Sequence, residues 1–361
     1  MSISLTEARN RYTNTLIGFY QQLTTPTGFL RSDFADEVST TKYVSFDVQR
    51  FGEQVAVDVQ RGTEGNTNTF DENMNKLFLP PYYREKFHAT SMDLYDRALG
   101  SPLIDEGVYA QLVQETAKRM KHLQNKIDRA AELQCAQVKE FGIVTLKDGT
   151  IINFKRRGEM MSVLGDGNWW ASAGVDPYKT IEGSAKRLRQ IGKMEGGGTV
   201  NVLCGEDAWT DFMNNDVVKQ RNDIKVWKLD DIVPPARGVV GGVYHGTVTC
   251  GSYTAHMWTY PEFYDHPTTG VSTPYWNPKK ICVTPYHKPK FVLAYGAVPR
   301  LLMGKQPVAS LGTTTDVMGK YVIGDYTDSR IDSHIFDIKS AFVAIPMAVD
   351  QMDTVQVCPD A

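Results

Sequence analysis

The chain has 361 residues, of which 42% are hydrophobic and 22% are charged, and its formal net charge is −3. These values are typical of a folded soluble protein with two or three compact units, and they exclude a globally basic nucleic-acid-binding protein while leaving room for a local basic face. No apolar run reaches about 18 residues, and residues 1–14 lack a signal-peptide core, so we expect neither a membrane span nor a secretion signal.

Residues 1–40 predict an arm rather than a domain. A short helix over residues 5–23 would be broken by the Pro and Gly residues of positions 24–28. Phe29, Leu30 and Phe34 are isolated apolar anchors after that break. Because such a segment cannot bury much of itself, we expect it to lie on a surface of its own subunit or of a neighbour.

Residues 41–90 predict a two-stranded ribbon. Alternating sequences over 43–48 and 54–59 are typical of strands, and residues 61–75 are polar and rich in Gly and Asn. The prolines that follow favour extended structure over 78–83. A ribbon without a third strand is marginal by itself, so we expect it to fold back on the body or to lie on another subunit.

The longest predicted element is a helix over residues 105–141, with Asp105 as its N-cap and Gly142 as its stop. At about 1.5 Å per residue it would be on the order of 50 Å long, enough to span most of a domain. Its charged residues between positions 115 and 140 lie outside an apolar stripe roughly 100° wide. The stripe consists of Tyr109, Leu112, Val113, Met120, Leu123, Ile127, Ala130, Ala131, Val138 and Phe141.

The sequence after this helix favours a helix that lies across a sheet over an isolated coiled-coil arm. An Asp-Gly pair is flanked by β-forming residues over 143–154, which is the pattern of a β-hairpin. An Asp-Pro pair then starts a second helix over 176–191, whose basic last turns suit the negative end of the helix dipole. The Gly triplet at 196–198 lies between a helix and a strand, the wrong order for a phosphate-binding loop, so we interpret it as a hinge.

The rest of the chain is rich in strands, which with the long helix predicts an α+β protein. Strands are predicted over 199–204, 224–227, 238–244, 247–250, 256–260, 281–284, 291–296 and 334–346. A helix is predicted over 205–214, and residues 304–332 are interpreted as an extended crossing.

No residue cluster in the sequence specifies a reaction. The chain lacks a nucleophile elbow, a zinc-protease motif and a Cys-x-x-Cys pair, and its five scattered cysteines predict reduced thiols. Glu262, Asp265 and His266 could bind a metal or act as acid and base, although such residues are more often solvated loop polars. We therefore expect no catalytic residue, no metal and no cofactor.

Several stretches, taken in their order along the chain, carry a resemblance to a known family. They are Phe29-Leu30-Arg31 in the arm, Arg61-Gly62 and residues 78–83 around the ribbon tip, the long helix from Asp105 into the hairpin, residues 200–209, residues 241–246 before the 258–260 strand, residues 278–283, and the tail from 340 to 357. This order resembles the major capsid protein E family of tailed phages, the lambda-type branch of the HK97-like capsid fold. The resemblance covers nearly the whole chain but has no single diagnostic motif.

The resemblance implies a definite set of parts and residues. The parts are an N-terminal arm (1–40), an E-loop (41–90), a P-domain containing the long helix (91–195), an A-domain (196–325), and a return strand with the tail (326–361). The implied arm contacts are Phe29, Leu30 and Arg31, the implied E-loop contacts between subunits are Arg61, Gly62, Phe70, Lys76 and Phe78, and the implied core positions of the long helix are Leu112, Met120, Leu123, Ile127 and Val138.

The resemblance also implies a function. The chain would be a major head protein that assembles in the host cytoplasm into pentamers and hexamers, forming the icosahedral capsid of a virion around double-stranded DNA, with no chemistry of its own. Scaffolding and portal proteins are implied partners, and a decoration protein is an optional one. No long scaffold segment precedes the arm, so we expect either a separate scaffolding protein or a chain that begins after processing, and the initial Met1 argues against processing.

Three alternatives stay open at this point. An encapsulin-like compartment shell would share the fold but hold an enzyme cargo. A two-domain enzyme would place its active site at the 196–198 hinge and use Glu262, Asp265 or His266. A nucleic-acid-binding module would use Lys186, Arg187 and Arg189, and its binding would depend steeply on salt.

Overall fold

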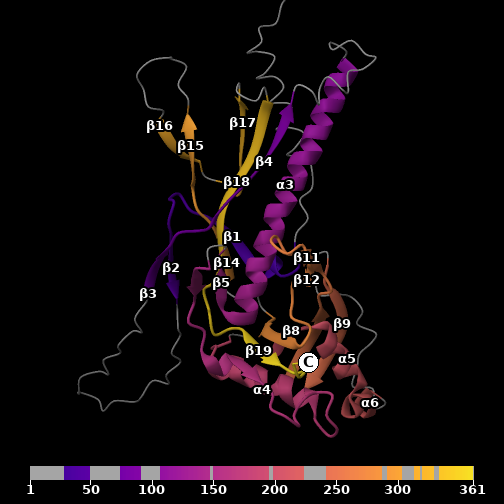
Figure 1. Cartoon of the computed structure of the whole chain (residues 1–361). Helices are drawn as coiled ribbons and strands as arrows, with labels where there is room; N and C mark the ends of the chain where they lie inside the picture. The colour runs from indigo at the N-terminus through magenta and orange to yellow at the C-terminus, as the bar shows by residue number, and fades with distance from the viewer. Residues whose placement is uncertain are drawn as a thin grey trace, which may run out of the picture.

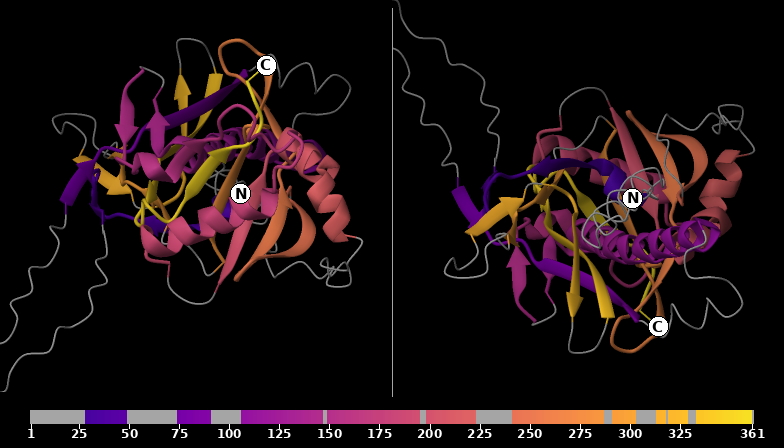
Figure 2. Two further views of the ribbon diagram at one scale, coloured as in Figure 1. Left: turned by 90° about the horizontal axis from the view of Figure 1, so that it is seen from below. Right: turned by 90° about the horizontal axis from the view of Figure 1, so that it is seen from above.

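The structure is a computed structural model that describes residues 28–48, 74–90, 106–146, 149–194, 198–222, 241–286, 291–302, 313–317, 319–328 and 333–360. Figure 1 shows the chain as two sheet-containing halves connected by the long helix α3 (Glu106–Phe141). The views in Figure 2 agree that the β2–β3 ribbon projects on one side of the molecule and helices α5 and α6 lie on the other.

The first half contains a five-stranded sheet in which β18 is the shared strand. Its members are β1 (Phe34–Val38), β14 (Phe291–Tyr295), β18 (Ser333–Pro346), β17 (Val322–Asp328) and β4 (Tyr82–Thr90). The strand β18 has 14 residues, pairs along its first part with both β4 and β17, and pairs along its last part with β14. The predicted strand over 334–346 is thereby confirmed.

The second half contains a six-stranded sheet covered by helices. The strands are β7 (Met161–Val163), β19 (Asp353–Gln356), β13 (Lys280–Pro285), β8 (Thr199–Cys204), β10 (Tyr253–Thr259) and β9 (Val243–Cys250), and the helices are α4 (Pro177–Gln190), α5 (Glu206–Asn214) and α6 (Asp216–Asn222). Asp176 caps α4 by accepting a hydrogen bond from the backbone N–H of Tyr178 at 3.0 Å, as its sequence predicts. The helix α6 was not predicted.

Four small two-stranded sheets complete the described part of the chain. They are β2 (Val44–Val48) with β3 (Met74–Phe78), β5 (Ile143–Thr145) with β6 (Ile151–Asn153), β11 (Phe263–Asp265) with β12 (Ser272–Pro274), and β15 (Val298–Leu302) with β16 (Thr313–Val317). The β5–β6 pair confirms the predicted hairpin. Two short 3-10 helices, η1 (Arg31–Asp33) and η2 (Gly158–Met160), precede β1 and β7.

The long helix runs for 36 residues and ends where its sequence predicts. Gly142 has φ +67°, a left-handed conformation that favours glycine, and its N–H donates to the carbonyl of Val138 at 2.9 Å. The buried guanidinium of Arg156 donates to the Lys139 carbonyl at 2.9 Å and also to the Met160 carbonyl and the Thr354 hydroxyl at 2.6 and 2.8 Å. The end of α3 is therefore fastened to η2 and β19 by one side chain.

The apolar stripe of α3 lies against the five-stranded sheet. Met120, Ile127 and Val138 are buried in the same hydrophobic core as β18, and Leu123 is partly buried there. The side chain of Leu112 lies outside the described part. Gln134, within the stripe, receives a hydrogen bond from the backbone N–H of Ala344 in β18 at 3.1 Å. A helix lying on a sheet, rather than a free coiled coil, is the arrangement found.

Several strand assignments differ from the sequence expectations. Residues 82–90 were placed in the ribbon, but they pair with β18. The partner of β2 in the ribbon is β3. The predicted strand at 54–59 lies outside the described residues. The expected crossing at 304–332 contains β16 and β17. Strand partners far apart in sequence are chosen by packing of the whole sheet, which local alternation does not reveal.

Sheet membership also crosses the predicted domain boundaries. The strand β14 lies within the 196–325 segment but pairs with β18, whereas β19 lies within the 326–361 segment but belongs to the six-stranded sheet. Each sheet therefore includes a strand from a segment that was assigned to the other part. The two sheets do not correspond to continuous segments of the chain.

Candidate assembly site

The start of the described chain is bound to a second stripe of α3, which is polar. Asp128, Glu132, Cys135 and Lys139 recur at spacings of four, three and four residues on α3, and their exposed fractions are 8%, 4%, 0% and 3%. Spacings of three and four place side chains on one helix face. We call these four residues the arm-binding stripe.

The arm-binding stripe contacts residues 30–33 through charged side chains. Glu132 accepts hydrogen bonds from the backbone N–H groups of Leu30 and Arg31 at 2.7 and 3.0 Å. Asp128 accepts from the Arg31 guanidinium at 3.0 Å, and the Lys139 ammonium pairs with Asp33 at 2.6 Å. Charged hydrogen bonds of this kind are stronger than neutral ones, so the arm has a fixed register on the helix.

Two glycines make room for the docked arm. A Cβ atom on Gly28 would lie 1.9 Å from a carboxylate oxygen of Glu132, and a Cβ atom on Gly242 would lie 2.3 Å from the ring of Phe29. The Phe29 ring is buried and lies 5.4 Å, between centroids, from both Trp258 and Tyr260. The arm is therefore clamped between α3 and the six-stranded sheet.

The electrostatics of this cluster follow from burial. Burial raises the pKa of Asp128, although Tyr321 and Arg31, which donate hydrogen bonds to it, counteract part of that rise. Burial also raises the pKa of Glu132, against the opposing effect of its backbone hydrogen bonds. Burial by itself would lower the pKa of Arg31, but its surrounding phenolic and carboxyl groups raise that pKa overall, so Arg31 stays cationic.

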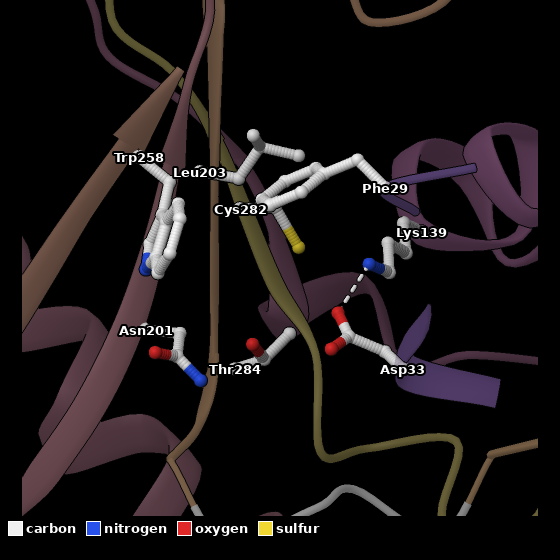
Figure 3. Close-up of a pocket in the computed structure, with 8 residues that line it drawn as sticks. All are labelled: Phe29, Asp33, Lys139, Asn201, Leu203, Trp258, Cys282 and Thr284. Atoms are coloured by element: carbon white, nitrogen blue, oxygen red, sulfur yellow. Dashed lines mark hydrogen bonds and ion pairs between the residues drawn. The ribbon is translucent and has the colours of Figure 1, made fainter. Parts of the chain in front are cut away.

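A small cavity lies beside the docked arm (Figure 3). It has a volume of about 10 Å³, room for about one water molecule, and it is lined by Phe29, Asp33, Lys139, Asn201, Leu203, Trp258, Cys282 and Thr284. The Asn201 side-chain oxygen is buried and has no hydrogen-bond partner among the described residues. A space of this size holds no substrate or cofactor, and it has the polarity of an internal hydration site.

The predicted arm and ribbon residues fall in different places. Phe29, Leu30 and Arg31 all contact their own subunit, as described above. Arg61, Gly62 and Phe70 lie outside the described residues. The backbone of Lys76 lies in β3, and its side chain is outside the described part.

The base of the β2–β3 ribbon is attached to the body. The Phe78 ring, at the end of β3, lies 5.8 Å from the ring of Phe154. The backbone N–H of Ala297 donates to the carbonyl of Thr41 at 2.9 Å, just before β2. Tyr43 and Leu79, which flank the paired residues, are 47% and 50% exposed. The ribbon therefore leaves the body from a fixed and partly apolar base.

The residues considered for catalysis, Glu262, Asp265 and His266, lie in or next to strand β11 (Phe263–Asp265). Glu262 and Asp265 are exposed beside the β11–β12 hairpin, and the His266 ring nitrogen accepts the backbone N–H groups of Thr268 and Thr269 at 3.3 and 3.4 Å. The ring therefore stabilises a turn. No group of three His, Cys, Asp or Glu side chains within the described ranges could hold a metal ion.

The basic end of α4 is occupied by contacts within the subunit. Lys186 pairs with Glu182 at 2.8 Å, Arg187 pairs with Asp353 at 2.7 Å, and Arg189 donates to the Met194 carbonyl at 3.2 Å. These contacts explain the charges without a bound phosphate.

All five cysteines are free and buried. Burial raises the pKa of Cys250 to about 12, which disfavours the reactive thiolate. No helix within the described ranges is long and apolar enough to span a lipid bilayer.

The sequence profile described as phage major capsid protein E matches residues 12–310. The chain belongs to this family. The match includes most of the arm, the ribbon, α3 and the strands from β5 to β15, and it ends before β16. No curated protein matches the sequence of this capsid-family chain.

Solved structures place the family member in the HK97-like capsid fold. A crystal structure described as a prophage capsid protein of Escherichia coli CFT073 has a TM-score of 0.64 and 15% identity, covering 96% of this chain and 99% of its own. A phage-related protein from Bordetella bronchiseptica RB50 has a TM-score of 0.51 and 11% identity, covering 96% and 98%. An encapsulin complex from Synechococcus elongatus PCC 7942 is a weaker likeness, with a TM-score of 0.43 and 10% identity over 99% and 96%.

Sequence reasoning missed the arm-binding stripe of this capsid-family protein. It placed the charged residues between positions 115 and 140 outside the apolar stripe and assigned them no contact. In the structure α3 is covered on two sides, so Asp128, Glu132 and Lys139 are buried as well. The four-three-four spacing of Asp128, Glu132, Cys135 and Lys139, together with the opposite charges of Arg31 and Asp33, was the signal that could have revealed the stripe.

Proposed function

We propose that this protein assembles into the pentamers and hexamers of a closed icosahedral shell around the double-stranded DNA of a tailed phage. The shell would be the capsid of the virion, assembled in the host cytoplasm with a scaffolding protein and a portal protein. A decoration protein is an optional partner. The subunit needs no catalytic group for this function.

The observation that carries the proposal is the combination of the family match over residues 12–310 with the projecting β2–β3 ribbon. Within the described residues, β2 and β3 pair only with each other, and Figure 1 shows them apart from both large sheets. An isolated two-stranded ribbon is marginal in water. Contact with a neighbouring subunit would provide the missing packing, in agreement with an E-loop role for this segment.

The docked arm supports the same proposal. Because residues 28–33 are fixed on α3, the preceding residues start from a defined point at the body of the subunit. A segment that starts from a fixed point can reach the same place on every neighbour, which a repeating shell requires. We accordingly assign the five-stranded sheet with α3 to the P-domain and the six-stranded sheet to the A-domain.

The first test is negative-stain electron microscopy of the purified chain, alone and co-expressed with its scaffolding protein. Closed shells or hexameric rings are expected, and a uniform small oligomer in both samples would refute the proposal. Replacing residues 61–73 with a short Gly-Ser linker leaves β2 and β3 in place. That variant should stay folded by circular dichroism but fail to form shells. The nucleic acid content of the particles then distinguishes a phage shell from a protein-filled compartment.

A further inference from the structure

The exposed face of α3 has an unusual composition. Between Thr116 and Glu140, the exposed side chains of this helix are all basic residue types. They are Lys118, Arg119, His122, Lys126 and Arg129. We call these five residues the basic stripe. The chain as a whole carries a net charge of −3, so this face differs from the average surface.

The basic stripe is straight and narrow. At 100° and 1.5 Å per residue, its members fall within an arc of about 100° and along a length of about 16 Å. Figure 1 shows α3 running beside β4 and β18 toward one end of the molecule. A rigid helix therefore presents the charges as one row, and duplex DNA has a phosphate for every 1.7 Å or so of its axis.

Few carboxylates oppose the basic stripe. Glu85 forms an ion pair with Lys126 at 2.9 Å, the only such pair that the stripe makes within the described residues. Asp128 and Glu132 of the same helix are buried and directed toward the arm. Arg119 lies over the ring of Phe87, at 6.0 Å from its centroid, with its charge still exposed to solvent.

The chemistry of the stripe favours a nucleic acid backbone over an acidic protein segment. No exposed apolar side chain lies among the basic residues from Thr116 to Glu140, so a peptide would bury little apolar surface on it. Contacts to phosphate need only cations, and they carry no sequence information. Long, flexible Lys and Arg side chains suit a partner that lies against the helix in many registers.

We propose that the basic stripe of α3 binds the phosphate backbone of duplex DNA. This inference rests on the proposed capsid function and adds to it the surface that contacts the DNA. Binding would be independent of sequence and would weaken steeply with salt.

The test compares two full-length variants with equal changes in charge. The stripe variant carries Lys118→Gln, Arg119→Gln and Arg129→Gln. The control variant carries Lys179→Gln, Lys186→Gln and Lys219→Gln, which are exposed on α4 and α6. For each protein we would measure shell formation by electron microscopy, and binding to a fluorescent 30-base-pair duplex by anisotropy at several salt concentrations.

The outcomes separate this inference from the proposed function. If the inference holds, the stripe variant still forms shells, and the slope of log affinity against log salt becomes shallower by about 2 to 3, while the control keeps the wild-type slope. The inference would be overturned if both variants lost DNA affinity equally, or if the wild type did not bind the duplex at low salt. A stripe variant that keeps its DNA affinity but loses shell formation would show that the stripe contacts protein instead. Failure of the wild type to form shells would count against the capsid function itself.

Discussion

Replacing Phe29 by Ala should measure how firmly the arm is docked on its own subunit. The Phe29 ring is 2% exposed and contacts Trp258 and Tyr260. Loss of a buried aromatic ring costs about 1.5–3 kcal/mol in transfer free energy, and the cavity left behind brings the total to about 3–5 kcal/mol. The cavity already beside the ring would merge with the new space, so little relaxation is expected.

The assay is urea unfolding of the purified full-length chain, followed by tryptophan fluorescence, to which Trp258 beside Phe29 contributes. A loss of about 3–5 kcal/mol is a large share of the stability of a typical domain. The matched control is Val38→Ala, because Val38 is 40% exposed at the end of β1 and should change stability by less than about 0.5 kcal/mol. A change below about 1 kcal/mol for Phe29→Ala would contradict the docking described here.

Three further predictions follow from the same core. Burial raises the pKa of Glu132, so the stability that this group contributes should fall as pH rises through its folded pKa. Glu132→Gln should therefore flatten the dependence of the unfolding free energy on pH, measured by urea unfolding. Gly242→Val would overlap the arm's aromatic ring and should cost about 1–3 kcal/mol in urea unfolding, against almost no cost for Gly165→Ala, whose added carbon meets nothing within 4 Å. Ile127→Asp would bury an unpaired charge beneath α3, and loss of native circular dichroism and soluble yield is expected; a folded variant would mean that this helix face is not core.

Caps, helix ends and hairpins were predictable because each depends on a few neighbouring residues. The N-cap at Asp176, the glycine at the end of α3 and the Asp-Gly hairpin each depend on residues within a few positions, and all three appear where the sequence places them. The apolar stripe of α3 likewise predicted which helix face meets β18, since Met120 and Ile127 are both buried there.

The pairing of distant segments was not predictable from a single sequence. The strand β1 pairs in parallel with β14, which lies more than 250 residues later, and β4 pairs with β18 at a similar separation. The sequence Met74–Phe78 lacks the alternation that marks a strand, although it pairs with β2. The buried charges of α3 were missed for a related reason, since the partner that neutralises them is the arm, about 100 residues earlier.

The contact made by Arg156 has a mechanical consequence. Its planar guanidinium connects the last turn of α3, η2 and β19, and β19 is a strand of the six-stranded sheet. A force that tilts the long helix is therefore transmitted to that sheet through one buried side chain, Arg156, which lies in the short connection between β6 and η2. A load applied to α3 would therefore be shared by both halves of the subunit, and the subunit would resist bending at their junction.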